Sequence, residues 1–512
     1  MNRKLRLLVA FAVMIPAGAS ISTPSSMAAP SAFPQGVAGY GGATDAILWT
    51  RHPSGGRVHY RVSTTREFRR IVAEGTMRAR AANDYTIKPS VSGLRPGLTY
   101  FYQFGSRRGL SPIAKFQTLR GPNSQRGFDF AISGDSDKLW TDWPDDPPGQ
   151  MAVLARVRET NPAFFIYLGD TIYSDSETGA EPALTLQEKW AKYRANRVRA
   201  AKRMLSSVSV WAGWDDHEVI NDYDGAVLAQ TDPALLEAGQ KAFFDYWPVR
   251  EEPTYRSTRV GANAEFFVLD ERTYRTQSPD EEDSPCRLED GSLDLAPTMP
   301  PGDRQALNLP PASPACLAHM FDPTRTMLGA EQKAWLLDGL SNSTARWKFI
   351  VNQVPITEAY AVPYDRWEGY HAERDEILRY IRDNEIENVV FLTTDIHANA
   401  GTRVYVDKQT DEVPVAYEII AGPIQTCTLD CELANVVGPG QGENFVTFMR
   451  FRGLIDADCM DINTYAYAHV TMPDDASRLS VQWRTGERAR NGGGTLIEGC
   501  DETIVAAPDV TP

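Results

Sequence analysis

Two common catalytic signatures are missing from this 512-residue sequence. No Gly-x-Ser-x-Gly occurs, which excludes the strained serine turn of α/β-hydrolases. No Gly-x-x-x-x-Gly-Lys-Ser/Thr occurs either, which excludes a phosphate-cradling P-loop. The chain also lacks repeats and low-complexity tracts, and its 42% hydrophobic and 23% charged residues are typical of a globular protein. Its length predicts one large domain together with a smaller one.

Long apolar runs are equally scarce, and the most apolar one lies at the start. Leu7 to Ala19 follows three basic residues and precedes small residues around Ser26 to Ala29. This order predicts an export signal over residues 1–29, with an N-terminal anchor or disordered tail as the alternative. The run is too short to span a bilayer as a helix, which takes about 20 residues. We therefore expect a secreted protein, extracellular or periplasmic, without a transmembrane anchor. Residues 1–29 contain no Arg-Arg pair, which favours general secretion over the twin-arginine route.

Cysteine is absent from the first 285 residues, and the six cysteines all follow. An even number in an exported chain predicts disulfides. Sequence order suggests the pairs Cys286–Cys316, Cys427–Cys431 and Cys459–Cys500, although six cysteines allow about 15 connectivities. A structural zinc site is the alternative, but paired Cys-x-x-Cys spacing is missing.

Positive charge is in deficit, because the formal net charge is −15. A field of this sign repels nucleic acids and anionic membranes, so a nucleic-acid scaffold role is excluded. It would also repel a phosphate ester unless bound cations reversed the potential locally. Nothing in the sequence indicates an oligomeric state.

The residues before 123 are predicted to form an all-β domain over 30–122. Strands are expected at 46–50, 57–62, 85–91 and 98–104, where β-branched and aromatic residues partly alternate. The phrase from Val91 to Phe104 resembles the late strands of a fibronectin type III sandwich. Gly121 to Ser124 marks the boundary.

Residues 123–512 are predicted to form an α/β domain with layered sheets flanked by helices, because short apolar strands alternate there with helical segments. The strands are expected at 128–133, 163–168, 208–214, 347–351 and 388–393. The helices are expected at 151–161, 185–205, 329–340 and 372–384. Residues 276–326, rich in proline and acids, are expected to form a long surface insertion.

Four of these strands end in potential metal ligands. The groups are Asp135, Asp170, the run Asp215 to Glu218, and Asp395 with His397. One Gly-Asp after a strand could simply cap a helix. Four such ends in one layered sheet instead predict that these side chains converge within metal-binding distance, because α/β folds place their functional residues at the carboxyl ends of strands.

The ligand types predict two different metal sites. Asp135, Asp170, Tyr173 and His397 combine carboxylates, a phenolate and an imidazole, which suits Fe³⁺. The second site would combine Asp170, Asp216, Asp395 and an amide oxygen from Asn352 or Gln353. This all-oxygen set favours Ca²⁺, with Mg²⁺ or Mn²⁺ as alternatives to it, over Zn²⁺.

His217 is predicted to assist catalysis together with Asp170 and Asp216. Its imidazole could donate a proton or hydrogen bond to ester oxygens. A structural histidine paired with a carboxylate is the alternative. Tyr173 could likewise be a core residue.

These motifs together resemble the alkaline phosphatase D family of metallophosphoesterases. The resemblance rests on Gly134-Asp135, Gly169 to Tyr173, Trp214 to Tyr223 and Thr394 to His397, and it covers nearly the whole chain after the signal. It implies phosphomonoesterase and phosphodiesterase activity with an iron and calcium centre and metal-bound hydroxide. Metal ligation carries over to Asp170, Tyr173, Asp216 and His397, with Asp395 on the calcium side.

One position departs from the family, whose iron-ligating cysteine after the first strand is here replaced by Asp135. The Gly-Asp and Gly-Asp-x-x-Tyr motifs are similar to those of purple acid phosphatases, although the second-metal histidines of that group have no match. The expected substrate is a phosphate ester. A phospholipase D-like or teichoic-acid phosphodiesterase and a non-catalytic secreted binding protein are the alternatives.

Overall fold

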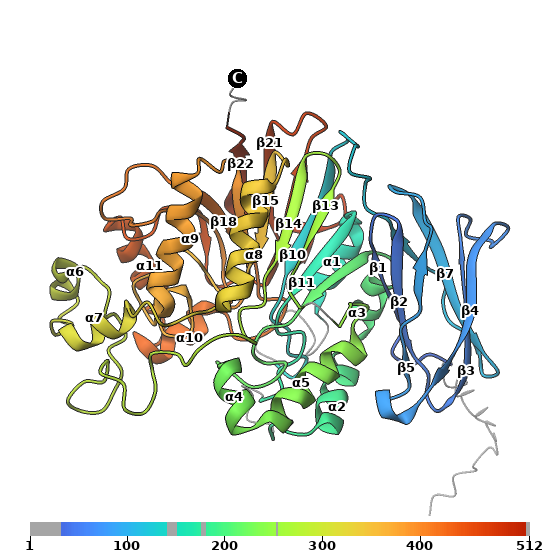
Figure 1. The fold of residues 1–512 in the computed structure, drawn as a ribbon, viewed down its shortest axis with the longest axis horizontal. Coiled ribbons are helices and arrows are strands. Elements are labelled where there is room, and N and C mark those ends of the chain that lie inside the picture. The colour runs from blue at the N-terminus through green and yellow to red at the C-terminus, as the bar shows by residue number, and fades with distance from the viewer. Residues whose placement is uncertain (1–31, 141–150, 176–180, 252–253, 508–512) are drawn as a thin grey trace, which may run out of the picture.

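The computed structural model describes residues 32–140, 151–175, 181–251 and 254–507 (Figure 1). The predicted export signal over residues 1–29 lies outside these ranges. Among the described helices, none combines the length and apolar character needed to cross a membrane. The strands of the N-terminal region lie at one end of the molecule, and helices α6 and α7 lie at the other (Figure 1).

The N-terminal region is all-β and forms two sheets around an apolar core. One sheet has the order β1-β2-β5, with β6 also paired to β2, and the other has the order β4-β3-β7-β8, with β9 paired to β7. The bounds are β1 Val37–Gly41, β2 Asp45–Arg51, β3 Gly56–Ser63, β4 Ile71–Ala79, β5 Thr86–Ile87, β6 Ser90–Ser92, β7 Thr99–Ser106, β8 Gly109–Leu110 and β9 Ala114–Gln117.

One predicted strand of this region is divided in the structure. Residues 85–91 form β5 and β6 separately, with Lys88 and Pro89 between them. Proline has no N–H to donate to a neighbouring strand, so the ladder is interrupted there. The carbonyl of Pro89 still accepts a hydrogen bond from the Leu48 amide at 3.0 Å.

The larger region is a sandwich of two sheets, which confirms the predicted layered α/β fold. One sheet has the order β12-β11-β10-β20-β21-β22 and the other the order β13-β14-β15-β16-β18-β17-β19. The bounds of the first are β10 Phe128–Ser133, β11 Phe164–Leu168, β12 Ser209–Gly213, β20 Ala466–Met472, β21 Arg478–Arg488 and β22 Gly494–Val505. Those of the second are β13 Arg256–Val260, β14 Ala264–Val268, β15 Trp347–Val351, β16 Val389–Thr393, β17 Asn399–Val404, β18 Ala416–Ile420 and β19 Ala457–Asp461.

Side-chain alternation along the strands builds three apolar layers. Phe130 of β10 points between the sheets, where its ring lies 5.4 Å from the rings of both Phe266 and Phe349. Its neighbour Ala131 points outward to a second cluster, which holds α1 and α3. Helices α8 and α9 cover the outer face of the other sheet in the same way.

The helices are α1 Ala152–Thr160, α2 Leu186–Asn196, α3 Arg199–Leu205, α4 Gly225–Thr231, α5 Pro233–Tyr246, α6 Pro301–Ala306, α7 Pro314–Met320, α8 Gly329–Asn342, α9 His371–Asp383, α10 Leu429–Val436 and α11 Gly442–Phe451. The helix predicted over 185–205 is two helices, because Val198 adopts an extended conformation between α2 and α3. The predicted insertion at 276–326 contains α6 and α7. All three predicted disulfide pairs are present.

The four ligand-bearing strand ends belong to two sheets, so their expected place in one sheet is wrong. Strands β10, β11 and β12 lie in the first sheet and β16 in the second. Two hydrogen bonds join the ends: Thr394 Oγ1 donates to the Leu168 carbonyl at 2.9 Å, and the Asp395 amide donates to Asp135 Oδ1 at 3.3 Å. The potential metal ligands therefore lie where the carboxyl ends of strands from two packed sheets face each other.

The interface between the two regions centres on Asp84. Its carboxylate is bonded to Arg51 of its own region and to Arg194 and Tyr246 of the larger one. Beside it, Trp49 Nε1 donates to the Asp245 carbonyl at 2.8 Å. Burial raises the pKa of Asp84, but the bonds from Arg51 and Tyr246 outweigh burial and leave that pKa below its ordinary value of 3.8.

We expect Asp84→Asn to lower the free energy of unfolding at pH 7 by about 2 kcal/mol, since it removes charged hydrogen bonds across this interface. A depressed pKa stabilises the fold above pH 3.8, and this contribution is lost as the pH falls through the folded-state pKa. Urea unfolding followed by tryptophan fluorescence should therefore show a difference from the wild type that shrinks below pH 3.8.

The control is Asp45→Asn. Asp45 also pairs across the interface, with Arg250, but the Arg250 side chain is 63% exposed. Exposed pairs contribute about 0–1 kcal/mol. Equal effects of the two substitutions would contradict the role given to Asp84.

Candidate metal centre

Four of the predicted ligand residues adopt backbone angles that are unusual for their type. Asp135, Asp170, Asp395 and His397 have φ values of 59°, 48°, 67° and 52°. This left-handed region costs a residue other than glycine about 1–3 kcal/mol and is concentrated at functional sites. Each of the four follows a strand directly or within a few residues. The strained turns aim the side chains at one another instead of along the strands.

The glycine of Gly169-Asp170 is required by packing. Gly169 has a φ of 69°, and a Cβ built on it would lie 2.6 Å from the Cβ of Asp215. Real Cβ atoms do not approach so closely, so only glycine lets the turns after β11 and β12 touch. In the Gly-Asp motif, the glycine is thus needed for the packing of the backbone, and the aspartate supplies the potential ligand.

Three clusters of potential ligands occupy this place, each with donor atoms within 4.8 Å of one another. The first is Asp135, Asp170 and His397; the second is Asp170, Asp216 and His217; the third is Asp216, Asp365 and Asp395. Asp170 belongs to the first two clusters and Asp216 to the last two. The clusters therefore form one continuous row of donors.

The first cluster has the features of a cation site. Tyr173 Oη lies 2.7 Å from His397 Nε2, so the phenol and the imidazole converge. Asp135 is fully buried, and its Oδ2 has no hydrogen-bond partner among the described residues. A buried carboxylate oxygen without a donor is costly unless a cation binds it. The chemistry of these donors fits a metal ion.

The pKa values of the carboxyl groups also favour a bound cation. Burial raises the pKa of Asp135 to about 8, although His397 opposes the rise. Burial and the nearby Asp216 and Asp215 carboxylates raise the pKa of Asp170 well above its ordinary value. Crowded carboxyl groups out of water resist ionisation, and a bound cation is the usual remedy.

Arg272 supplies positive charge to the third cluster. Its buried guanidinium pairs with Asp215, lies 2.6 Å from Asp365 and 3.3 Å from Asp395, and is 3.5 Å from Asp216. Burial raises the pKa of Asp216, but Arg272, His217 and hydrogen bonds from two backbone amides together outweigh burial, and the pKa ends below its ordinary value. Arg272 is not among the residues predicted from the sequence. The sequence does contain a pattern that could have indicated it, since the polar run Asp270 to Arg272 closely follows the apolar strand β14.

Asn352 and Gln353, the two predicted amide ligands, make hydrogen bonds to neighbouring loops. Asn352 Oδ1 accepts a hydrogen bond from Trp367 Nε1 at 2.9 Å, and its Nδ2 donates to the Val354 carbonyl. Gln353 Oε1 accepts from the Glu271 amide at 3.2 Å. These bonds help to hold the loops after β14 and β15, and each amide oxygen keeps a second lone pair that can face a cation. Asp365 is a further potential ligand in the third cluster.

His217 and His397 each have a carboxylate at Nδ1. His217 Nδ1 lies 2.6 Å from Asp175 Oδ1, and His397 Nδ1 lies 2.5 Å from Glu432 Oε1. A carboxylate at one ring nitrogen fixes the ring orientation and the tautomer, so that Nε2 faces the cluster. The ring of His217 also packs on that of Tyr173, with centroids 4.0 Å apart.

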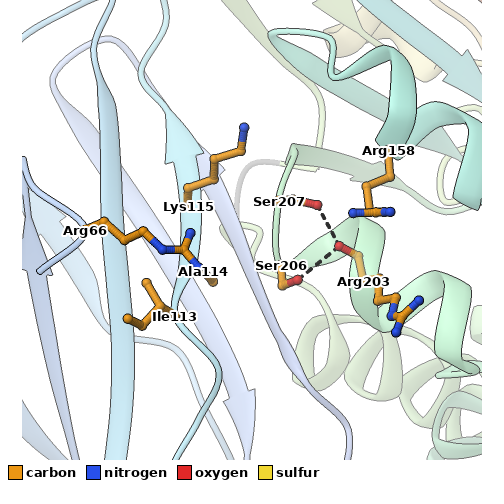
Figure 2. A pocket seen from close by; sticks show the side chains of 8 residues that line it. All are labelled: Arg66, Ile113, Ala114, Lys115, Arg158, Arg203, Ser206 and Ser207. Atoms are coloured by element: carbon orange, nitrogen blue, oxygen red, sulfur yellow. Dashed lines mark hydrogen bonds between the residues drawn. The ribbon is translucent and has the colours of Figure 1, made fainter. Parts of the chain in front are cut away.

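A cavity of about 470 Å³ between the two regions is a contrasting site (Figure 2). Its charged lining residues are all basic within the described part of the chain: Arg66, Lys115, Arg158 and Arg203. Two of these come from the ends of α1 and α3, which precede β11 and β12. The cavity is therefore at the opposite ends of these strands from the ligand clusters, and cationic side chains cannot ligate a metal.

The chain is similar to known phosphatases in sequence and in fold. A family model described as "PhoD-like phosphatase" matches residues 139–459, and one described as "PhoD-like phosphatase, N-terminal domain" matches residues 19–120. The curated protein "Alkaline phosphatase D" of Bacillus subtilis (strain 168) is 27% identical over 423 residues. That alignment covers 73% of this chain and 66% of the relative, so the chain spans just under two thirds of the relative's length.

Two solved structures share the fold. One described as "Structure of PhoD" superposes with a TM-score of 0.74 at 20% identity, covering 95% of this chain and 94% of that one. The purple acid phosphatase PPD1 from yellow lupin has a TM-score of 0.52 at 12% identity, covering 92% of this chain and 75% of that one.

The buried Glu218 offers a test of how the site is held. Its two carboxylate oxygens accept four hydrogen bonds, from the amides of Asp170, Thr171 and Asp215 and from Thr171 Oγ1. In Glu218→Gln one oxygen becomes an NH₂ group that cannot accept. We expect affinity for metal to fall about 10- to 100-fold, as for other groups that orient ligands. Metal content after dialysis against graded chelator measures this.

The matched control is Glu373→Gln. Glu373 is also buried and accepts hydrogen bonds from the Met327 and Leu328 amides, but it belongs to none of the clusters. It should lose stability but keep its metal. Loss of metal from both variants alike would show that Glu218 acts only through general stability.

Proposed function

The chain belongs to the PhoD-like phosphatase family, and on that premise we propose that it hydrolyses phosphoric esters with bound metal ions. The observation that supports this most is the row of three ligand clusters joined by Asp170 and Asp216. Ions held there would lower the pKa of bound water and neutralise charge on phosphoryl oxygens. Both monoesters and diesters fit this chemistry.

The donor types suggest which ions bind. Asp135, Asp170, Tyr173 and His397 would hold Fe³⁺, since hard oxygen donors and one imidazole suit it. Asp216, Asp395 and the shared Asp170 would hold Ca²⁺, with Asp365 and the amide oxygen of Asn352 or Gln353 as further donors. Mn²⁺, Mg²⁺ and Zn²⁺ are the alternatives that elemental analysis distinguishes. Asp135 stands where relatives in the family use a cysteine.

The protein's own side chains would position and protonate the ester. His217 faces the second cluster with the nitrogen opposite Asp175, in reach of a leaving-group oxygen. Asp175 is suited to hold the imidazole, because burial raises its pKa but the His217 contact outweighs burial and keeps the carboxyl ionised. Arg272 holds Asp216 and Asp395 in place through its guanidinium.

Export of the protein is part of the same proposal. Three disulfides are typical of proteins that fold outside the reducing cytosol. The basic and apolar start of the sequence supports general secretion. An exported phosphoric-ester hydrolase would meet phospholipid or teichoic-acid diesters as well as small monoesters.

Tyr173→Phe tests the iron assignment. A tyrosinate on Fe³⁺ gives a visible charge-transfer band, and the wild type should contain iron and show this colour. The variant should lose the band, because phenylalanine offers no oxygen donor. Tyr193→Phe removes another buried phenol, which lies in α2, and should keep the colour. A colourless wild type containing two equivalents of zinc or manganese would overturn iron.

His217→Asn tests the catalytic proposal. The metal-loaded wild type should hydrolyse p-nitrophenyl phosphate or its bis-ester, and chelator should abolish turnover. The variant should lose about 10²- to 10⁴-fold in kcat, the typical contribution of a general acid, while keeping its metal. His469→Asn is the control, since His469 also pairs with a carboxylate, Asp129, but lies on β20 outside the clusters. Metal-loaded protein without any turnover would contradict the proposed function.

A further inference from the structure

A cavity of about 420 Å³ opens directly onto the ligand clusters. Asp170, Asp216, Asp395 and His397 are among the residues that line one part of it. Volumes of about 300–1,000 Å³ are typical of small-molecule sites. Any ester whose phosphorus sits at the clusters must therefore extend its alcohol group into this cavity or past its rim.

The rest of the wall is mostly apolar and comes largely from two helices. Leu429, Leu433 and Val436 of α10 line the cavity at helical spacing. Phe445, Val446 and Met449 of α11 line it as well. An amphipathic helix normally buries such a stripe in the core. Here both stripes border a space that is continuous with the proposed catalytic site.

This apolar wall is tied to a proposed metal ligand. The Leu429 amide, at the start of α10, donates to the His397 carbonyl at 3.0 Å. Three residues later, Glu432 contacts His397 Nδ1. The Cys427–Cys431 disulfide closes the entry into the same helix. The apolar wall and the metal-binding end are thus held in a fixed relation to each other.

Three polar side chains of the wall already have partners. Thr357 Oγ1 and Thr402 Oγ1 are bonded to each other at 2.8 Å, and Glu432 is engaged by His397. A sugar or glycerol in this cavity would lose hydrogen bonds to water and regain few. An apolar group would instead release water from Leu429, Val436 and Phe445, the lining residues that are at least partly exposed.

We propose that this cavity binds the apolar alcohol portion of the substrate, so that the preferred phosphoric esters carry an alkyl chain or an aromatic ring. The proposal rests on the proposed function and specifies its substrate class. Its basis is the continuity between the apolar stripes of α10 and α11 and the ligand clusters.

The test uses a series of glycerol phosphodiesters whose second alcohol is methyl, butyl, octyl or 2-phenylethyl, each below its micelle concentration. Hydrolysis by the intact metal-loaded protein is followed by ³¹P NMR. We expect kcat/KM to rise about tenfold or more from the methyl to the octyl or phenylethyl ester, because each buried methylene favours binding. The ratio of these two esters tells whether a chain or a ring fits the cavity better.

Two variants locate the effect. Phe445→Ala should remove most of the gain in kcat/KM of the octyl ester over the methyl ester. Val436→Asn, at a position 43% exposed, should reduce the gain with little risk to folding. Phe448→Ala is the matched control, because Phe448 lies on the same helix but does not line the cavity. It should keep the full gain.

The outcomes separate the two proposals. Equal kcat/KM across the series, with turnover of every ester, would overturn the apolar site and leave the hydrolase intact. A gain that survives Phe445→Ala and Val436→Asn would also overturn it. Failure to hydrolyse any ester, p-nitrophenyl phosphate included, would refute the proposed function and the substrate class with it.

Discussion

The repulsion among the crowded, buried or partly buried carboxylates near the facing strand ends is the constraint on which the rest of the structure depends. Asp135, Asp170, Asp216, Asp365 and Asp395 lie within one row of clusters, and Arg272 is the cation that contacts several of them. Such a group is stable only with added positive charge. The acidic chain can thus approach an anionic ester because its most concentrated negative charge is the part that binds cations.

The surrounding framework holds these carboxylates close together by fixing the conformation of the ligand residues. Two packed sheets bring their strand ends together, and Glu218 ties the turns after β11 and β12 to each other. Glycine at 169 lets those turns touch. The left-handed angles at the ligands are unfavourable locally, and they persist because hydrogen bonds and packing on every side fix them.

The elements that were predictable are those with local signals. Strands β10 and β15 match the predicted ranges, because each is a short apolar run followed by polar residues. What depends on distant partners was not accessible from the sequence. Arg272 contacts carboxylates from three other segments. Asn352 Oδ1 accepts a hydrogen bond from Trp367, which lies in another segment. Assignment of the four strand ends to one sheet failed for the same reason, since sheet membership is set by pairing and not by sequence order.

The division of the ligands between two sheets has a consequence for the maturation of the protein. Asp135 follows the first strand of the sandwich, whereas His397 follows β16, and β20 to β22 complete the first sheet from the end of the chain. No partial chain emerging in sequence can assemble the donors early, because nearly the whole domain must first be made. For a chain that crosses a membrane unfolded, the centre then acquires its ions at the destination. If the protein is exported as proposed, the supply of metal ions at its destination would govern how much active protein accumulates.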